Sequence, residues 1–187
     1  MTLIIDRAWT LKVGYEARPA GQEVRALVRP TSDRGVLKVL SVELFEGDLM
    51  APAALTRACE GVDAVVHAAA VVRAHGPWEA FLDGIDGTKN LLASMARTGV
   101  ARLVHVSSIG VYGLGHHAEP LRETTALEAK PASWNHYGRE KLLTERLVWD
   151  AFAERKVEPV VVRPSATLGP GDRARSRPSS RRCGRAR

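Results

Sequence analysis

The chain has 187 residues, of which 45% are hydrophobic and 26% are charged, a composition that suits one globular domain with a sizeable core. No stretch approaches the ~18 apolar residues of a membrane helix, and residues 1–29 lack the basic-then-apolar layout of a signal peptide, so we expect a cytoplasmic protein. Cys59 and Cys183 lie far apart and no CxxC motif occurs, which argues against a disulfide and against a metal site.

The net charge of +6 originates at the C-terminal end of the sequence. Seven arginines fall within residues 173–187, and without them 20 basic residues stand against 21 acidic ones. This stretch is rich in Arg, Ser and Pro and has no core-forming periodicity, so we expect a disordered tail after a domain that spans residues 1–172. Such a tail would bind nucleic acid through charge alone, without specificity.

Hydrophobic periodicity predicts strands that alternate with helices. The expected strands are 2–5, 23–29, 42–45, 64–69, 102–107 and 157–162, and the expected helices are 52–59, 78–97 and 135–154. Residues 6–21 are hard to place, residues 30–35 are expected to turn, and residues 113–133 are expected to form a long polar loop. On the last helix we expect an apolar stripe facing the core, made of Leu142, Leu143, Leu147, Val148 and Phe152.

This alternation, with continuous apolar runs in the strands, predicts a parallel sheet covered on both faces, that is, a doubly wound α/β domain. Ligands of such domains bind at the carboxyl ends of the strands. The notable residues of the chain fall at those ends: Asp48, Ala68, Ala69, Ala70, Ser107, Ser108, Arg163, Pro164 and Ser165.

Two short stretches carry the chemistry. Tyr137 and Lys141 are four residues apart, so both lie on one face of the predicted helix, where a positive charge beside a phenol favours the phenolate. Ser107 and Ser108 end a buried strand, where a hydroxyl can hold a carbonyl or an alcohol against that phenol. The alternatives to a catalytic site are an exposed Tyr–Lys pair without a function and serines that only cap a helix or turn.

These motifs occur in a telling order: Gly47-Asp48-Leu49, Val66 to Ala70, Gly87 to Leu92, Ser107 to Gly113, Tyr137 to Lys141, and Arg163-Pro164-Ser165. From about Glu23 to Asp172 the chain resembles the extended short-chain dehydrogenases/reductases of the NAD(P)-dependent epimerase/dehydratase type. The resemblance implies a Rossmann-like sheet, here incomplete, and NADP or NAD as the cofactor.

The resemblance also implies roles for individual residues. Tyr137 would be the catalytic acid/base, Lys141 would lower the pKa of Tyr137 and bind the nicotinamide ribose, and Ser108 would hydrogen-bond the reacting oxygen with Ser107 beside it. Asp48 and Leu49 would contact the adenine, Ala68–Ala70 would border the cofactor, and Pro164 and Ser165 would flank the nicotinamide. For Asp48 the alternative is an ordinary loop carboxylate. Arg29 would accept the 2′-phosphate of NADP, or is a solvated charge.

Three features depart from the family pattern. Residues 6–13 contain no glycine where the family has a glycine-rich turn for the pyrophosphate, and Gly84 stands where the family usually has Asn. Family members are also much longer. We therefore hypothesise that both ends of the chain are altered relative to a working ancestor by a frameshift or a truncation.

The function expected from the sequence is an NAD(P)-dependent oxidoreductase or epimerase/dehydratase that acts on an alcohol or ketone through Ser108, Tyr137 and Lys141. The alternative is a non-catalytic, truncated remnant or a cofactor-sensing protein of the same fold. The expected partner is a small-molecule substrate, with no membrane and no specific nucleic acid, and a homodimer is left open.

Overall fold

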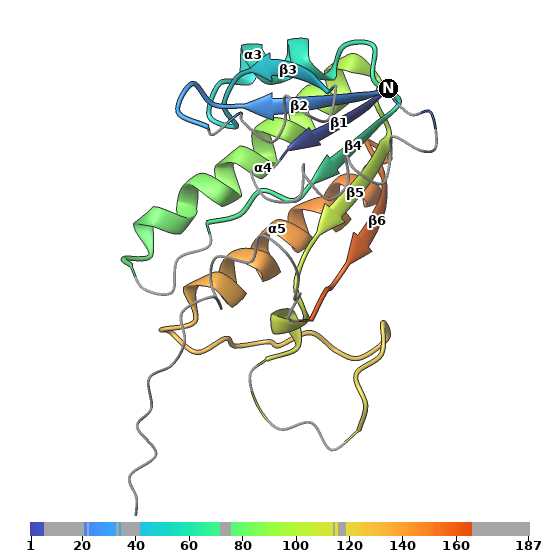
Figure 1. The fold of residues 1–187 in the computed structure, drawn as a ribbon. Helices are drawn as coiled ribbons and strands as arrows, with labels where there is room; N and C mark the ends of the chain where they lie inside the picture. The colour runs from blue at the N-terminus through green and yellow to red at the C-terminus, as the bar shows by residue number, and fades with distance from the viewer. Residues whose placement is uncertain are drawn as a thin grey trace, which may run out of the picture.

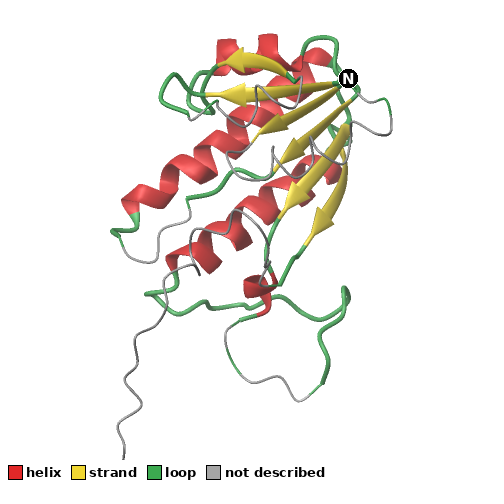
Figure 2. Cartoon of the chain, in the orientation of Figure 1, coloured by secondary structure: helices red, strands yellow, loops and turns green. Residues whose placement is uncertain are grey.

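The structure is a computed structural model that describes residues 1–5, 21, 23–32, 34, 42–71, 76–113, 115 and 119–165. Figures 1 and 2 show a sheet with helices packed along one of its faces. The strands are β1 (Thr2–Ile5), β2 (Val24–Val28), β3 (Glu43–Glu46), β4 (Ala64–His67), β5 (Arg102–Val106) and β6 (Glu158–Val162). The helices are α3 (Pro52–Cys59), α4 (Glu79–Thr98) and α5 (His136–Ala153), with a 3₁₀ turn η1 (Ile109–Tyr112).

The six strands form one parallel sheet in the order β3-β2-β1-β4-β5-β6. The chain leaves β1 in one direction to build β2 and β3, and then returns to the other side of β1 to build β4, β5 and β6. The strand order therefore reverses between β1 and β4, which is where open α/β sheets bind their ligands. The doubly wound parallel sheet predicted from the sequence is confirmed.

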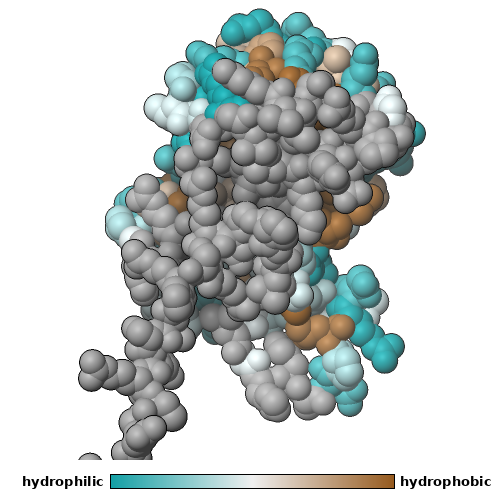
Figure 3. All heavy atoms as spheres, viewed as in Figure 1, coloured by the Kyte–Doolittle hydropathy of each residue, from teal (hydrophilic) through white to brown (hydrophobic). Residues whose placement is uncertain are grey.

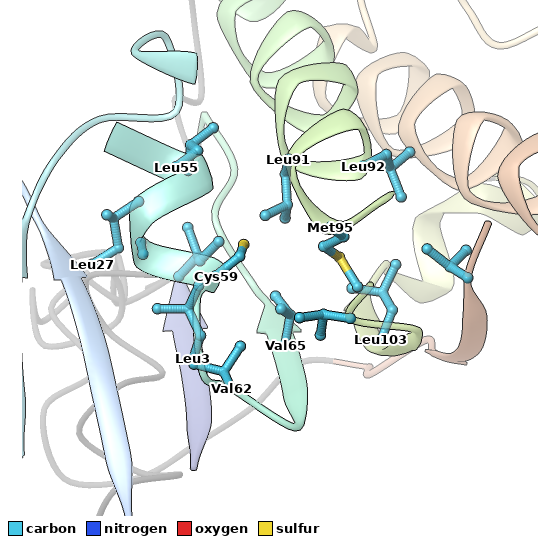
Figure 4. Close-up of a cluster of buried hydrophobic side chains, with 14 of the residues drawn as sticks. Leu3, Leu27, Leu55, Cys59, Val62, Val65, Leu91, Leu92, Met95 and Leu103 are labelled. Carbon is cyan, nitrogen blue, oxygen red and sulfur yellow. The ribbon is translucent and has the colours of Figure 1, made fainter. Parts of the chain in front are cut away.

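The main core lies between the sheet and the helical layer. Figure 4 shows side chains of β1, β2, β4 and β5 pointing toward those of α3 and α4. Leu3, Leu55, Leu91 and Met95 are fully buried in this cluster. Residues that alternate with them along the strands face the other way and are buried too, namely Ile4, Ala26, Val28 and Val66. Burial of both faces explains why the strands read as continuous apolar runs rather than as alternating ones.

Local sequence signals set the ends of the helices. Pro52 occupies the start of α3, where a missing N–H costs nothing. α4 ends at Gly99, whose positive φ of 74° is the left-handed conformation that glycine adopts without strain. α5 begins after Asn135, whose side-chain oxygen accepts a hydrogen bond from the N–H of Gly138. These ends agree with the predicted helices within one or two residues.

The six predicted strands are also confirmed, with small shifts at their ends. The strand expected at 42–45 runs from Glu43 to Glu46, and the one expected at 64–69 ends at His67. The early end of β4 matters because it leaves Ala68–Ala70 as an irregular segment beyond the sheet edge. The described part of the predicted loop 113–133 contains no helix or strand.

The apolar stripe predicted for α5 is wrong. Only Val148 of that stripe is buried, and Phe152 is 51% exposed. The face that α5 buries instead consists mostly of polar or small residues, namely Gly138, Glu140, Lys141, Thr144, Glu145, Val148 and Ala151. A periodicity argument assigns the apolar stripe to the core, but here polar and charged residues occupy most of the inner face. Leu142, Leu143 and Leu147 are only partly buried, and Leu147 packs at the margin of the core.

Apolar surface is also exposed at β6, the last strand of the sheet. Val160 is 59% exposed and Val162 is 38% exposed, and Figure 3 shows this surface at the right of the view, over β6. No helix among the described residues is long and apolar enough to cross a membrane. The atypical stretch 6–20 and the arginine-rich tail 173–187 lie outside the described residues, so the expectations for them remain predictions.

Candidate active site

Ser108 lies where β5 runs off the sheet edge. The backbone N–H of Ser107 still donates to Val162 O at 2.8 Å, and that of Ile109 donates to Pro164 O at 3.0 Å, which holds this segment against the end of β6. Ser108 is extended, and its hydroxyl oxygen accepts a hydrogen bond from Gly110 N at 3.1 Å. Ser108 thus caps η1, which is the structural role that we considered as the alternative to a catalytic one. This cap also fixes the position of its hydroxyl group.

Tyr137 and Lys141 lie in the first turns of α5, which passes behind the end of β5. Lys141 is only 3% exposed, and its Nζ donates to Val106 O at 2.8 Å. Its ammonium lies 6.0 Å from the centre of the half-buried Tyr137 ring. The alternative of an exposed Tyr–Lys pair is therefore wrong, because one member is buried and tied to the last residue of β5.

The hydroxyl of Ser108 and the phenol of Tyr137 face each other across this edge. Burial raises the pKa of Tyr137, a hydrogen bond with Ser108 lowers it, and the nearby carboxylate of Glu140 raises it further. The net direction is upward, whereas the sequence led us to expect that Lys141 would lower this pKa. Burial disfavours the phenolate more strongly than its neighbours favour it.

Ser107 and Ser108 point to different places. Ser107 is 2% exposed, and its hydroxyl lies close enough to Glu145 to lower the pKa of that carboxyl group. Burial opposes the ionisation of Glu145, but hydrogen bonds from Arg163 and Trp149 and the nearby Ser107 hydroxyl outweigh it, so its pKa is lowered. Ser108 therefore faces Tyr137, whereas Ser107 faces the interior between the sheet and α5.

Arg163 holds this corner of the molecule together. Its Nε donates to Glu145 Oε2 at 3.2 Å, its Nη2 donates to Glu145 Oε1, and its Nη1 donates to the hydroxyl of Tyr112 at 2.6 Å. Tyr112 in turn donates to Arg122 O at 2.9 Å. Arg163 thereby joins the end of β6 to α5, η1 and the long loop. We predicted Arg163 only as part of a motif, because nothing in the sequence marks Glu145 as its buried partner.

The other predicted cofactor residues follow the same edge of the sheet toward β3. Arg29 comes directly after β2 and Asp48 shortly after β3, and Arg29 Nε lies 3.9 Å from Asp48 Oδ2. The other carboxylate oxygen of Asp48 accepts from Met50 N at 2.8 Å, which orients the group. Both side chains are substantially exposed, at 59% for Arg29 and 41% for Asp48, so they are accessible to a ligand.

Leu49 is braced by α4. A Cβ on Gly87 would lie 2.8 Å from Leu49 Cβ, so only glycine lets the helix approach this closely. Asn90 Nδ2 donates to Leu49 O at 3.0 Å. The motif Gly87 to Leu92, on which the family resemblance partly rests, thus positions Leu49, a role that the sequence alone did not indicate.

Thr88 of the same motif braces β4. Its hydroxyl donates to Gly84 O at 2.8 Å and lies 2.9 Å from His67 Nε2. Since the hydroxyl proton is used on Gly84, His67 must donate from Nε2. Burial, together with the charge on Lys141 and the neighbouring His105, holds the pKa of His67 well below its usual range.

The remaining predicted residues are Ala68, Ala69, Ala70, Pro164 and Ser165, which follow β4 and β6. Ala68 is buried, and its N–H donates to Ile5 O at 3.1 Å, while Ala69 and Ala70 are partly exposed. The structure therefore brings the predicted residues of β2, β3, β4, β5 and β6 to one edge of the sheet, with Ser107 turned inward. Residues 6–13, where the pyrophosphate turn was expected, lie outside the described residues.

The sequence and the structure were compared with known proteins. Residues 16–184 match the NAD dependent epimerase/dehydratase family. Among curated proteins, the chain is 34% identical over 156 residues to sterol demethylase protein B of Methylococcus capsulatus, which covers 81% of this chain and 46% of that protein. It is 30% identical over 179 residues to cinnamoyl-CoA reductase 1 of Petunia hybrida, which covers 87% of this chain and 51% of the reductase.

A solved structure supports the same relationship. A short-chain dehydrogenase/reductase superfamily protein from Agrobacterium tumefaciens with bound NAD superposes with a TM-score of 0.71 at 30% identity, covering 87% of this chain and 48% of the other. The chain spans about half the length of the curated relatives that it matches.

Proposed function

The chain belongs to the NAD-dependent epimerase/dehydratase family, and on that premise we propose that it binds a nicotinamide dinucleotide and carries the proton-transfer residues for an alcohol or ketone substrate. The observation that carries this proposal is the juxtaposition of three side chains. The Ser108 hydroxyl faces the Tyr137 phenol, and the buried Lys141 lies one helical turn further along α5.

The residues at the sheet edge fit an elongated dinucleotide. Exposed Arg29 and Asp48 lie at the β2–β3 end, and small, partly exposed Ala69 and Ala70 lie near the point where the strand order reverses. Ser108 lies beyond them, just after β5. We assign Asp48 and Leu49 to the adenosine end, Ala68–Ala70 to the middle, and Lys141, Pro164 and Ser165 to the nicotinamide end, while Ser107 supports this end from the interior. When bound, the nicotinamide ring supplies the acceptor or donor of the hydride.

In this proposal Tyr137 exchanges a proton with the substrate oxygen. Ser108 is suited to hold that oxygen, because its hydroxyl accepts from Gly110 N and so keeps its proton for donation on the side that Tyr137 faces. The raised pKa keeps Tyr137 protonated at neutral pH, which suits the donation of a proton to a carbonyl that is being reduced. The positive charge of Lys141 stabilises the phenolate that remains.

Titration of the purified chain with NADH and with NADPH, followed by the fluorescence of the reduced nicotinamide, tests the proposal. We expect binding in the micromolar range that is lost in Lys141→Ala. Lys89→Ala is the matched control, because Lys89 is an exposed lysine on α4 that pairs with Asp86 of the same helix. If neither cofactor binds at millimolar concentration, the proposal is wrong for this chain.

The substrate we propose is a nucleotide sugar, a sterol-like compound or another secondary alcohol. We also propose a cytoplasmic location and leave a homodimer open.

A second candidate function is cofactor sensing without turnover, and it is favoured by the absence of glycine from residues 6–13. Saturable NADH binding without oxidation of NADH by any carbonyl compound of these classes would select that candidate.

A further inference from the structure

Glu140, between Tyr137 and Lys141 on α5, is buried although the proposed proton transfer does not use it. Its side chain is 1% exposed, and Oε1 accepts a long hydrogen bond of 3.4 Å from Val71 N. Oε2 has no hydrogen-bond partner among the residues that the structure describes. Burying a carboxylate without full pairing is costly, so such a group is an unusual occupant of a helix interface.

Gly84 on α4 makes room for this carboxyl group. A Cβ on Gly84 would lie 2.9 Å from Glu140 Cδ and closer still to Oε1. Gly84 is nevertheless inside a helix, where glycine is less favourable than alanine by about 1 kcal/mol. The two helices therefore fit around Glu140 at the expense of a weaker α4.

Glu140 connects three elements that meet at the site. Val71 follows the Ala68–Ala70 segment after β4, Gly84 belongs to α4, and Glu140 itself belongs to α5. Within the described part of the chain, the Lys141 ammonium and the Val71 N–H act on the ionisation of this carboxyl, and the carboxyl in turn acts on the Tyr137 phenol. At this contact α4 presents Gly84, which is uncharged.

The ionisation of Glu140 is coupled to that of Tyr137. Burial raises the pKa of Glu140 to about 7, although the Lys141 ammonium and the Val71 N–H act to lower it. The Glu140 carboxylate in turn raises the pKa of Tyr137. A proton on Glu140 therefore makes the phenol easier to ionise, and loss of that proton makes it harder.

We propose that Glu140 is a positioning residue that holds the segment after β4 against α5 and, through its own protonation, tunes how readily Tyr137 gives up its proton. This inference rests on the proposed role of Tyr137 as the acid/base. It assigns to the fourth residue of the Tyr137–Lys141 stretch a control over the proton transfer that its neighbours perform.

The test is a pH titration of the full chain that follows the near-ultraviolet absorbance of the phenolate. The signal of Tyr137 is isolated by subtracting the curve of Tyr137→Phe. Glu140→Gln keeps the shape of the side chain and the acceptor for Val71 N but removes the charge, so we expect the midpoint of Tyr137 ionisation to fall by roughly one pH unit. Glu154→Gln makes the same charge change at the exposed end of α5 and should leave the midpoint in place.

Glu140→Asp separates tuning from packing. It keeps the charge but shortens the side chain, so tuning predicts a midpoint nearer to that of the wild type than Glu140→Gln gives. A purely structural role predicts the reverse, because glutamine is the better mimic of shape. An unchanged midpoint in Glu140→Gln, or the reversed order of the two variants, overturns the inference.

The titration contains neither cofactor nor substrate. Its outcome is therefore separate from that of the cofactor-binding experiment, and a chain that binds no NADH can still show the shift in the midpoint of Tyr137. Failure of the proposed function and failure of the Glu140 inference are thus distinguishable.

Discussion

The helical layer buries two different kinds of surface against the same sheet. Under α3 and α4 the interior is apolar, with Leu55, Leu91 and Met95 fully buried. Under α5 the interior is largely polar up to Val148, and Lys141 and Glu145 are buried there against strand ends and against Arg163. The apolar half is stabilised by removal of surface from water, whereas the polar half depends on specific pairing. Charged groups thus collect where chemistry on a bound substrate would need them.

The largest effect we expect comes from breaking the pairing in the polar half. Arg163→Met leaves the Glu145 carboxylate buried without its guanidinium, which should lower the free energy of unfolding by about 4 kcal/mol. Because the pKa of Glu145 is lowered in the folded state, its stabilisation is present above its unfolded pKa of 4.5 and fades as the pH falls below that value. The effect of the substitution should therefore shrink in acid.

Urea denaturation at neutral pH and at acid pH measures this effect. Arg146→Met serves as the control, because Arg146 is an exposed arginine on α5. The double variant Arg163→Met with Glu145→Leu should recover part of the loss, since it removes the orphaned charge. Equal destabilisation in the single and double variants would show that packing, rather than charge pairing, dominates this half.

In the apolar half, stability should depend on the volume of the buried side chains instead. Leu91→Ala removes a fully buried side chain between α4 and the sheet and should cost about 3 kcal/mol. The loss should not depend on pH between neutral and mildly acid conditions, because no titratable group is exposed by it. Leu82→Ala on the same helix, where Leu82 is 38% exposed, should cost much less. Thermal denaturation of both variants at two pH values makes the comparison.

Substitution of Arg29 tests the proposed adenosine end of the cofactor site, which lies over the apolar half. Arg29→Ala should weaken NADPH binding by about tenfold, or about 1.4 kcal/mol, while leaving NADH binding nearly unchanged, if the guanidinium accepts the 2′-phosphate. Arg97→Ala, at the exposed last turn of α4, is the control. A parallel loss for both cofactors would assign Arg29 to its ion pair with Asp48 instead.

The buried His105, which is influenced by Lys141 and Glu145 of α5, should make the polar half sensitive to acid. Burial lowers the pKa of His105 to about 3, with the Lys141 charge acting in the same direction, so the unfolded chain binds a proton before the folded chain does. Stability associated with His105 is therefore lost as the pH falls below its unfolded pKa of 6.5. Glu140 contributes with the opposite sign, because its raised pKa lets the folded state bind a proton first.

His105→Leu should remove part of this acid sensitivity. Between about pH 7.5 and about pH 5.5, we expect the wild type to lose about 1 kcal/mol more than the variant does. Chemical denaturation across this range measures the slope. Parallel slopes for the two proteins would mean that His105 is hydrated in the folded state.

The smallest effect on stability concerns Ser108. Ser108→Ala removes the cap of η1 and should cost about 1 kcal/mol or less. The substitution should also raise the pKa of Tyr137, because it removes the Ser108 hydrogen bond that lowers this pKa. Near-ultraviolet titration gives the direction, with the exposed Ser133→Ala as control. An unchanged midpoint in Ser108→Ala would show that the two hydroxyls do not interact.

Much of the fold was predictable because each element carries a local signal. Pro52 at the start of α3 and Gly99 at the end of α4 mark helix ends through backbone geometry alone. The inner strands were predictable because both of their faces are largely buried, which makes most of their residues apolar. Ser108 lies at the carboxyl edge because it follows a parallel strand, and Tyr137 lies there because the helix that connects β5 to the parallel strand β6 begins at the same edge.

The inner face of α5 was not predictable in this way. Hydrophobic periodicity pointed to a stripe that includes Phe152, but the structure turns Glu140, Lys141 and Glu145 inward. A charged residue is predicted to be exposed unless a partner for its charge is known. The partners of these residues are distant in the sequence. Arg163 lies 18 residues from Glu145, and Val71 lies 69 residues from Glu140.

By itself, the sequence determined the order of strands and helices, the parallel sheet and the spacing that puts Tyr137 and Lys141 on one helical face, since these depend on local geometry and short-range periodicity. Only the tertiary structure decided which face of α5 is buried, that Ser107 turns inward while Ser108 faces Tyr137, and that Gly84 admits the Glu140 carboxyl. These features arise from contacts between distant segments, whose burial and charge pairing no local pattern encodes.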